Sequence, residues 1–534
     1  MDPGPRVEAA AYQSIGRMNS AFLMKILFVS AEVAPFAKVG GLADVAGSLP
    51  KALRALGHDV RVLMPSYRMV EEGLGAQGSG LVADGAGSLR RVAEFDVPIN
   101  SSWVKRAYLN ETTLDEGQRA GRSQDKGGRD VRAPESSSVP VYMVGTDEWF
   151  TRTTSSETIY MPGVDAYLFL AAAAMQLPEV LGWMPDVVHS NDWHSGFVPV
   201  LLQERRWKDA IASVFTIHNL AYQGEFGFDV IDKLGLPHSL FNMEQLEFHG
   251  SINFLKAGCV FSDQVNTVSP TYAHEAQSQE YGCHLEGLMN YLSHQGRLSG
   301  ILNGIDDRVF NPATDPSLAA RYDADHLDGK AVCRSALLKR LDMEPFEGAP
   351  LLGAVTRLSD QKGMNLLLNA APEIFQMPCQ IVVQGLGDPW LCDSFAALQK
   401  AWPKHFRFVQ AFDVQLAQQV YAGCDGFLMP SLFEPCGLGQ MIAMRYGTLP
   451  IVRSTGGLAD TVHEGLNGFV FEHKTSADLL AAVRRAFVSF GSEEWPGLRD
   501  SAMRGDYTWA KSAREYVAMY ERAVELRRKF ARSA

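Results

Sequence analysis

The sequence predicts an α/β protein made of two similar halves, each a parallel sheet covered by helices, that face a central cleft. Three observations favour this fold class. The chain has 534 residues, which is more than one hydrophobic core usually organises. Short apolar runs alternate with helical patterns along most of it. The five letters GGLAD occur twice, at 40–44 and at 456–460, each time between a strand-like run and an amphipathic stretch.

The first half begins with a strand, a helix and a second strand. The apolar run 25–30 predicts a buried strand, apolar residues recur at helical spacing from Leu42 to Leu56, and 58–65 predicts the next strand. Because parallel strands need a crossover connection, this order predicts a parallel sheet with helices on both faces. Further strands are predicted at 141–144, 186–189, 213–217 and 264–268.

A second series of strands starts near Pro350, and a helix follows Gly363 within it. The loops after these strands should face those of the first half across a cleft, where open α/β sheets usually bind ligands. We expect domains at 24–300 and 301–505 and a C-terminal helix at 506–534. The strands of this series are predicted at 351–355, 380–384, 406–410, 425–429 and 449–452.

Two segments do not follow this pattern. Residues 1–23 precede the first strand and are expected to form a disordered extension. Between Glu111 and Ser138, Gly, Ser, Arg, Asp and Gln replace almost all apolar residues, so 111–139 is expected to be a mobile surface insertion. We assign no chemistry to either segment.

Composition excludes several classes of function. Basic residues number 49 and acidic residues 61, which gives a net charge of −12 and argues against nucleic acid or an anionic membrane as a partner. No stretch of the sequence is apolar for long enough to cross a bilayer. The seven cysteines are widely spread and contain no CxxC pair, which predicts reduced thiols, no disulfide framework and no zinc site.

The glycine pairs are candidate anion sites. A glycine pair lets backbone N–H groups approach an anion, and a following helix N-terminus adds the positive end of its dipole. Lys38, two residues before Gly40, can share such an anion with the first loop. The alternative is a tight turn beside a solvated lysine.

Two further loops can carry chemistry. Arg357 and Lys362 leave the predicted strand 351–355 on one loop, and both can reach a single diphosphate and neutralise charge on a departing group; the alternative is an exposed basic loop. Glu434 lies in a strand-to-helix turn at 430–440, where it can hold sugar hydroxyls beside an anion. Its alternative is an acid that stabilises the helix dipole.

Seven motifs follow one another along the chain: KVGGLADV at 38–45, NDWH at 191–194, HNLAYQG at 218–224, NGID at 303–306, RLSDQKG at 357–363, FEPCGLGQ at 433–440 and STGGLADTV at 454–462. Together they resemble the bacterial glycogen synthase and plant starch synthase family. The resemblance runs from about Met24 to the C-terminal helix.

The resemblance implies a GT-B fold, with two Rossmann-like domains, and a retaining glycosyltransferase. The implied reaction moves glucose from ADP-glucose to the non-reducing end of an α-1,4-glucan such as glycogen or starch. The implied compartment is a bacterial cytoplasm or a plastid stroma, without secretion. By the same resemblance, 24–300 is the acceptor side and 301–505 the nucleotide-sugar side.

The resemblance also assigns roles to residues. Arg357 and Lys362 would hold the diphosphate, and Glu434 would line the glucosyl site rather than act as a nucleophile, since the motifs show no close pair of carboxylates. The expected catalytic residues are Lys38, Arg357, Lys362 and Glu434. The nucleotide-sugar would also contact Gly40, Gly41, Asn303, Cys436, Gly437, Leu438, Thr455, Gly456 and Gly457. The residues expected on the acceptor side are Asp165, Asn191, Asp192 and His194.

Two positions depart from the family pattern. Gly439 lacks the side chain that relatives often carry there, which removes a contact to the donor. Asn191 stands where many bacterial relatives have His, so a sugar contact at that position would come from an amide.

Neither a cofactor nor a required metal is expected. The segment 385–387 lacks the third glycine of a dinucleotide fingerprint, and the two aspartates of 323–325 lie in a polar connector. The histidines near strand ends lack metal-ligand spacing. Cys436 is expected to pack or to form a hydrogen bond rather than to act as a nucleophile.

Three other functions stay open at the level of sequence. The same fold can use UDP-glucose, because the residues that read the base are not identifiable from spacing. A glucan phosphorylase-like enzyme would bind pyridoxal phosphate through a lysine. A catalytically silent glucan-binding scaffold is disfavoured because Lys38, Arg357, Lys362 and Glu434 occur together.

Overall fold

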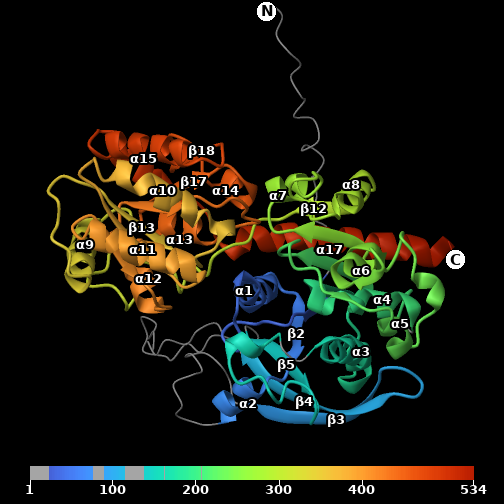
Figure 1. Cartoon of the computed structure of the whole chain (residues 1–534). Helices are drawn as coiled ribbons and strands as arrows, with labels where there is room; N and C mark the ends of the chain where they lie inside the picture. The colour runs from blue at the N-terminus through green and yellow to red at the C-terminus, as the bar shows by residue number, and fades with distance from the viewer. Residues whose placement is uncertain (1–22, 76–88, 115–137, 161–162, 206, 534) are drawn as a thin grey trace, which may run out of the picture.

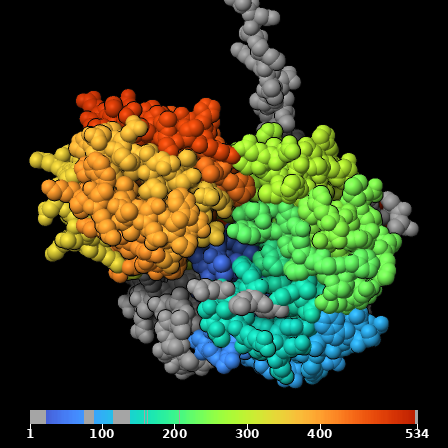
Figure 2. Space-filling view, viewed as in Figure 1, coloured from blue at the N-terminus to red at the C-terminus, as the bar shows by residue number. Residues whose placement is uncertain are grey.

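The chain forms two α/β lobes that lie side by side (Figure 1). The computed structural model describes residues 23–75, 89–114, 138–160, 163–205 and 207–533. Most of the segments predicted as an extension, 1–23, and as an insertion, 111–139, lie outside the described residues. In the space-filling view the lobes meet along the upper part of the molecule, and residues of the first blue segment are visible between them (Figure 2).

The N-terminal lobe is built on a mixed sheet whose centre is parallel. β1 pairs in parallel with β2 and β6, whereas β3 and β4 are added antiparallel at one edge. β6 and β7 are buried along their whole length, as expected for strands with helices on both faces. In spatial order the strands are β12 (Leu298–Gly300), β11 (Gln264–Thr267), β7 (Ala212–Ile217), β6 (Val187–Asn191), β1 (Lys25–Val29), β2 (Asp59–Pro65), β5 (Val139–Gly145), β4 (Val104–Leu114) and β3 (Arg90–Pro98).

The antiparallel edge corrects the predicted bounds of the insertion. β4 continues to Leu114, and β5 begins at Val139, which pairs with Leu114. The predicted insertion 111–139 is therefore too long at both ends. At the end of β4, partly exposed Thr113 follows buried Thr112. A strand that carries such polar residues has few apolar positions, so a prediction based on apolar content alone mistakes it for a loop.

Helices cover both faces of this sheet (Figure 1). The predicted first helix is present, and its buried residues Leu42, Val45, Leu49 and Leu53 recur at helical spacing. A small antiparallel sheet adds β8 (Glu225–Phe226), β9 (Glu247–Phe248) and β10 (Ser251–Asn253). The helices of the lobe are α1 (Gly41–Ala55), α2 (Arg68–Gly75), α3 (Val164–Val180), α4 (Phe197–Glu204), α5 (Asp229–Leu234), α6 (Phe254–Phe261), α7 (Pro270–Glu275) and α8 (Glu286–His294).

The C-terminal lobe contains a wholly parallel sheet. Its predicted strands are all present within one residue of their expected ends. In spatial order they are β15 (Phe406–Val409), β14 (Gln380–Gln384), β13 (Leu351–Val355), β16 (Gly426–Met429) and β17 (Leu449–Arg453), followed by β18 (Phe469–Phe471). The helices are α9 (Asp328–Arg340), α10 (Met364–Ile374), α11 (Pro389–Ala401), α12 (Val414–Gly423), α13 (Gly439–Arg445), α14 (Gly456–Thr461), α15 (Ser476–Phe490) and α16 (Trp495–Arg504).

The last helix, α17 (Trp509–Ser533), returns to the N-terminal lobe (Figure 1, red). Its buried stripe, which includes Tyr516 and Tyr520, belongs to the core of that lobe. Near its end, Arg527 donates to both carboxylate oxygens of buried Asp263, at 2.7 and 3.2 Å. None of the helices in the described ranges combines the length and the apolar character needed to span a bilayer.

The lobes contact each other through α7 and α14, which lie next to each other in Figure 1. The backbone N–H and the hydroxyl of Thr271 donate to the carboxylate of Asp460, at 2.9 and 2.7 Å. The hydroxyl of Ser269 donates to the carbonyl oxygen of Pro435 at 2.6 Å. The second GGLAD motif is thereby tied to the N-terminal lobe.

Arg527→Met should lower the free energy of unfolding by about 3–5 kcal/mol, because it removes the guanidinium that pairs with the buried carboxylate of Asp263. Urea unfolding followed by circular dichroism measures the change. Arg522→Met, at an exposed position of the same helix, is the matched control and should shift the value by less than about 0.5 kcal/mol. Equal stability of the two variants would contradict this account of how α17 is held.

Candidate active site

The loops selected from the sequence converge because both sheets share one strand order. The central strands run β5-β2-β1-β6-β7-β11 in the N-terminal lobe and β15-β14-β13-β16-β17-β18 in the C-terminal lobe. In each sheet, two neighbouring central strands, β1 and β6 or β13 and β16, connect to the next strand on opposite sides. The loops that follow these two strands therefore diverge and open a crevice. The loops after β1, β13 and β16 carry Lys38, Arg357 and Glu434, respectively, and Asn191 is the last residue of β6.

Lys362 and Glu434 form an ion pair in the C-terminal crevice. Nζ of Lys362 lies 2.6 Å from Oε2 of Glu434, and the hydroxyl of Ser431 donates to the same oxygen at 3.0 Å. The two side chains are 18% and 8% exposed, so water screens the pair weakly. An ammonium has three N–H donors, which leaves Lys362 able to bind a phosphate while it keeps Glu434. Arg357 lies on the same loop and is exposed.

Arg453, which sequence reasoning missed, fixes the loop that carries Glu434. Its buried guanidinium donates to the carbonyl oxygens of Ser431 and Leu432, at 2.9 and 2.7 Å. A charged residue at the end of the apolar strand β17 was the available signal. Ser431 was missed as well, because nothing in its sequence context separates it from an ordinary turn residue.

The second glycine pair packs against this loop. A Cβ on Gly456 would lie 1.9 Å from the carbonyl oxygen of Glu434, and one on Gly457 would lie 2.2 Å from that of Cys436. Both amides donate within the chain, Gly457 to Glu434 at 3.2 Å and Gly456 to the carboxylate of Glu275 at 3.1 Å. These glycines therefore allow their backbone to lie close to the backbone of the loop that carries Glu434. Their contact with a nucleotide-sugar stays a prediction.

Glu275 is another residue that sequence reasoning missed. It ends α7 in the N-terminal lobe, and its carboxylate accepts a hydrogen bond from the hydroxyl of Thr455 at 3.0 Å, in addition to the amide of Gly456. Thr455 was predicted to contact the donor; its hydroxyl is engaged by this carboxylate across the interface between the lobes.

Cys436 is buried, and burial raises the pKa of its thiol to about 12. The backbone N–H of Asn303 opposes this rise in pKa. Burial of the thiol agrees with a packing role, and its contact with the nucleotide-sugar stays a prediction. The side-chain oxygen of Asn303 is buried and has no hydrogen-bond partner among the described residues. A ligand hydroxyl can supply that partner. Gly437 next to Cys436 adopts a φ of 75°, which favours glycine.

The first glycine loop is more open than the second. Nζ of Lys38 lies 2.6 Å from Asp44, and their side chains are 48% and 30% exposed. A Cβ added at Gly40 or Gly41 would meet nothing within 4 Å. The amide of Gly40 is engaged by a buried carboxylate, Glu32, at 2.9 Å. The loop therefore has space for a ligand beside a cation that is only loosely held.

Three of the four predicted acceptor-side residues lie at the end of β6 or directly after it. The side-chain amide of Asn191 donates to the carbonyl oxygen of Val29 at 3.2 Å, and its oxygen lies 3.0 Å from Nε2 of His218. Burial lowers the pKa of His218 to about 3, so the ring is neutral and Nε2 carries the proton that Asn191 accepts. The side chain of Asn191 is therefore engaged by Val29 and His218 within the protein, and its contact with a sugar stays a prediction.

His194 is the acceptor-side residue with free hydrogen-bonding capacity. Both ring nitrogens are buried without a hydrogen-bond partner among the described residues, and the ring stacks on Tyr160 with centroids 4.6 Å apart. Burial lowers the pKa of His194 to about 3, so the neutral ring offers one donor and one acceptor to a sugar.

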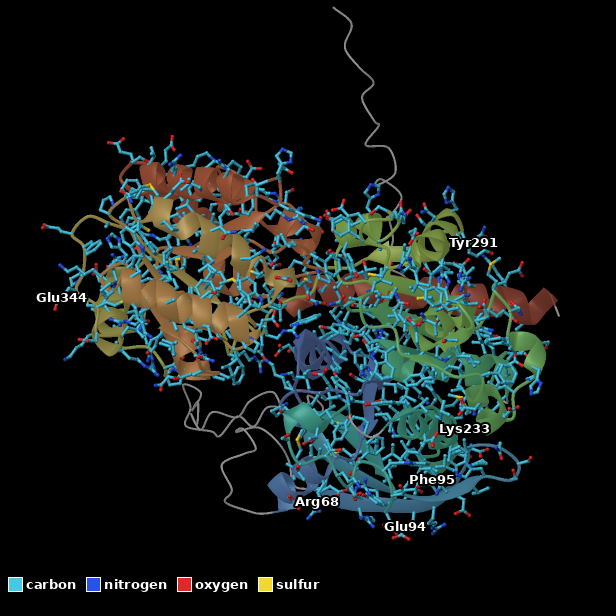
Figure 3. The ribbon with its side chains drawn as sticks, in the orientation of Figure 1. Arg68, Glu94, Phe95, Lys233, Tyr291 and Glu344 are labelled. Carbon is cyan, nitrogen blue, oxygen red and sulfur yellow. The ribbon has the colours of Figure 1, made fainter. Side chains whose placement is uncertain are left out.

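Asp192 is strained and buried. It adopts a φ of 55°, a conformation that is costly for a residue with a side chain, and its carboxylate accepts the backbone N–H of His218 at 2.8 Å. Burial raises its pKa to about 7. The carboxylate of Asp165 pairs with Lys233 at 2.8 Å, and its contact with the acceptor stays a prediction. Figure 3 labels Lys233 on the side of the N-terminal lobe away from the other lobe.

A cavity of about 250 Å³ lies between the lobes, beside Lys38. Lys38, Asp44 and Ser48 line it from the N-terminal lobe. Phe412, Tyr421 and Leu438 line it from the C-terminal lobe. Phe412 is 82% exposed, which makes it an accessible aromatic face. No sequence signal identified Phe412 or Tyr421, because their position beside the cavity depends on the packing of the lobes.

No group of three or more His, Cys, Asp or Glu in the described part of the chain could hold a metal ion. The carboxylates of the segment 323–325 are used locally: Asp325 pairs with Arg504 at 2.5 Å, and Asp323 accepts the backbone N–H of His326 at 2.8 Å. The absence of a required metal stays a prediction.

Comparisons with known proteins identify the class of this arrangement. Residues 25–291 match the family model described as starch synthase catalytic domain, and 349–488 match the model described as glycosyl transferases group 1. A sucrose-phosphate synthase from Thermosynechococcus elongatus shares the fold, with a TM-score of 0.55, 16% identity and coverage of 93% of this chain and 98% of that one. The protein is a glycosyltransferase with the GT-B fold, as predicted.

Closer relatives define the family. The chain is 42% identical over 520 residues to a glycogen synthase of Desulforudis audaxviator, covering 94% of this chain and 97% of that one. It is 42% identical over 513 residues to a glycogen synthase of Myxococcus xanthus, covering 94% and 100%. The catalytic domain of starch synthase IV from Arabidopsis thaliana, bound to ADP and acarbose, superimposes with a TM-score of 0.81 at 31% identity, covering 94% and 100%. The chain belongs to the glycogen and starch synthase family.

Asp192→Asn should change how stability depends on pH. The pKa of Asp192 is about 7 in the folded protein against 3.8 for the free side chain, so folding favours its protonated form, and this favourable term is lost as pH rises through 7. The free energy of unfolding of the wild type, relative to the variant, should therefore fall by about 2 kcal/mol between pH 5.5 and pH 8. Urea unfolding at both pH values measures it.

Asp96→Asn removes an exposed carboxylate from the same lobe and is the matched control. The difference between this variant and the wild type should be the same at both pH values. Parallel pH profiles for Asp192→Asn and the wild type would show that Asp192 does not titrate in this range.

Proposed function

We propose that the protein transfers glucose from ADP-glucose to the non-reducing end of an α-1,4-glucan, with retention of configuration. The observation that carries this proposal is the pair of Lys362 with buried Glu434, which places a cation and a hydroxyl-binding carboxylate side by side in the C-terminal crevice. The names of the two bacterial relatives, and the ADP and acarbose bound by the Arabidopsis domain, support the choice of nucleotide-sugar and glucan.

In this proposal the donor spans the C-terminal crevice. The adenosine occupies the cavity between the lobes, where Phe412 and Tyr421 offer aromatic faces to a base. Arg357 and Lys362 hold the diphosphate, and Lys38 reaches it from the N-terminal lobe. Positively charged groups from both lobes then surround the diphosphate, which is the leaving group.

The glucosyl group lies between Glu434 and the acceptor wall. The carboxylate of Glu434 and the free side-chain oxygen of Asn303 accept sugar hydroxyls. The 4-hydroxyl of the glucan attacks the anomeric carbon on the face from which the diphosphate departs. The bond from that carbon to the phosphate oxygen breaks, ADP takes the electron pair, and the hydroxyl proton passes to the departing phosphate. Lys362 and Arg357 stabilise the negative charge on that phosphate.

The acceptor enters from the N-terminal lobe. His194 is the residue there with unused donor and acceptor capacity, and it offers both to the terminal sugar. We assign the reaction to a bacterial cytoplasm or a plastid stroma, and the seven unpaired cysteines favour such a reducing compartment. The boundaries 24–300, 301–505 and 506–534 are part of the same proposal.

Donor competition tests the proposed reaction. Purified protein should incorporate radiolabelled glucose into glycogen from ADP-glucose and much less from UDP-glucose. Preference for UDP-glucose would select the same-fold alternative. No incorporation from either donor, with glycogen still bound, would select the non-catalytic scaffold.

Lys362→Ala should reduce kcat by roughly 100-fold or more, because it removes a charge that stabilises the departing diphosphate. The KM for glycogen should change little, since glucan binds on the other lobe. Lys339→Ala, at an exposed position of α9, is the control and should leave both constants unchanged. An unaltered kcat at saturating donor in Lys362→Ala would refute the role of the ammonium.

A further inference from the structure

Glu32 connects the two sides of the site. It follows β1, is 3% exposed, and its Oε2 accepts the backbone N–H groups of Val39 and Gly40 at 2.7 and 2.9 Å. Its other oxygen, Oε1, accepts the hydroxyl of Tyr160. One carboxylate therefore binds the first glycine loop with one oxygen and a distant tyrosine with the other.

Tyr160 continues this connection to the acceptor wall. Its ring stacks on His194, with centroids 4.6 Å apart and planes inclined by 19°. The edge of Tyr167 packs against the same imidazole at 5.1 Å. The donor-side loop, Glu32, Tyr160 and His194 thus form an unbroken series of contacts.

The hydrogen bonds of Glu32 are directional and strong. Burial raises its pKa, and the N–H groups of Gly40 and Val39 oppose that effect. Lys38, the nearest loop cation, pairs with Asp44, so Glu32 is held by backbone amides and a hydroxyl. Charge-assisted hydrogen bonds are roughly twice as strong as neutral ones. Loss of the carboxylate would free two amides of a loop that is otherwise open to solvent.

The other lobe contains a comparable contact. The carboxylate of Glu275 binds the amide of Gly456 and the hydroxyl of Thr455 in the second copy of the glycine motif. Each GGLAD loop is therefore held by a carboxylate from outside the motif. In the second copy the surrounding backbone also fixes the loop, whereas in the first copy Gly40 and Gly41 have no such neighbours. The first loop depends more on its carboxylate.

We propose that Glu32 is a positioning residue of the transfer reaction: it holds the loop 38–41 so that Lys38 faces the donor diphosphate, and it holds Tyr160 so that His194 faces the acceptor. This inference rests on the proposed glucosyl transfer. Glu32 touches no substrate in it and acts through Lys38 on one side and His194 on the other. Donor and acceptor geometry are then set by a single side chain.

Glu32→Ala should lower kcat/KM for ADP-glucose by roughly 100-fold, the loss expected when a catalytic group is displaced by about 1 Å. The KM for glycogen should rise as well, because Tyr160 loses its anchor. The decisive measurement is a double-mutant cycle with Lys38→Ala. The cycle is measured at saturating glycogen, so that the weaker glycogen binding expected from the Tyr160 side does not contribute. If Glu32 acts on the donor through Lys38, Glu32→Ala should then cost less than about threefold in kcat/KM for ADP-glucose when Lys38 is already absent. Equal losses in both backgrounds would overturn the proposal.

Two further variants separate positioning from general stability. Glu32→Gln keeps an acceptor for the two amides and a polar partner for Tyr160, so it should lose less than about tenfold; a loss equal to that of Glu32→Ala would contradict a hydrogen-bonding role. Glu71→Ala is the matched control, since this carboxylate of α2 accepts hydrogen bonds from Ser66 and Asn110. Figure 3 labels Arg68, the first residue of α2, at the lower edge of the N-terminal lobe in that view.

Glu71→Ala should lower Tm while leaving kcat/KM unchanged. If it lowers kcat/KM as far as Glu32→Ala does, the effect of Glu32 is a general loss of stability and the proposal is overturned. Should Glu32→Ala fail to fold, Glu32→Asp, which withdraws the carboxylate by one methylene, takes its place in the cycle. Failure of the wild type to transfer glucose from ADP-glucose would defeat the proposed function instead, and the two failures are therefore distinguishable.

Discussion

The site depends on the ion pair between Lys362 and Glu434 and on the loop that presents it. A buried carboxylate is costly without partners, and Glu434 has two, the ammonium of Lys362 and the hydroxyl of Ser431. Both partners need the loop after β16 in one conformation. Arg453 donates to two carbonyl groups of that loop, so contacts within the protein hold the loop in this conformation.

The two copies of the GGLAD motif show how one sequence can serve different physical roles. In the second copy, Gly456 and Gly457 allow the chain to approach the backbone of the loop around Glu434 closely enough that any side chain would collide. In the first copy, Gly40 and Gly41 border open space. The same letters therefore produce a packing contact in one lobe and an accessible loop in the other, and the tertiary surroundings decide which.

Much of the fold could be predicted because its strands are short, apolar and separated by helical patterns. The loops after the strands were predicted to face each other across a cleft, and the structure has Lys38, Arg357 and Glu434 in such loops and Asn191 at the end of β6. The end of β4 could not be predicted, because one face of that strand is polar. α17 was predicted as a helix, but its return to the first lobe depends on contacts such as Arg527 with Asp263, which lie far apart in sequence.

The residues of the candidate site that belong to a motif could be predicted from the sequence, whereas the residues that hold those motifs in place could not. Lys362 and Glu434 stand in recognisable loops, and the structure brings them together. Glu32 is a single acidic residue in an otherwise apolar segment. That isolated charge was a usable signal, but its partners, Tyr160 and the amide of Gly40, became evident only from the fold. Residues that support the site act through contacts with residues that are far away in the sequence, and no local sequence pattern predicts those contacts.

The cations on the two sides of the cleft differ in what a ligand must do to engage them. Lys38 is paired with Asp44 at the surface, and an exposed ion pair contributes at most about 1 kcal/mol, so a diphosphate can displace Asp44 at little cost. Lys362 is paired with a buried carboxylate, and breaking such a pair costs about 3–5 kcal/mol. Lys362 therefore has to keep Glu434 and use its remaining donors for the phosphate. The diphosphate and the sugar hydroxyls are then bound by one connected group of atoms, and movement of the leaving group is coupled to the position of the sugar.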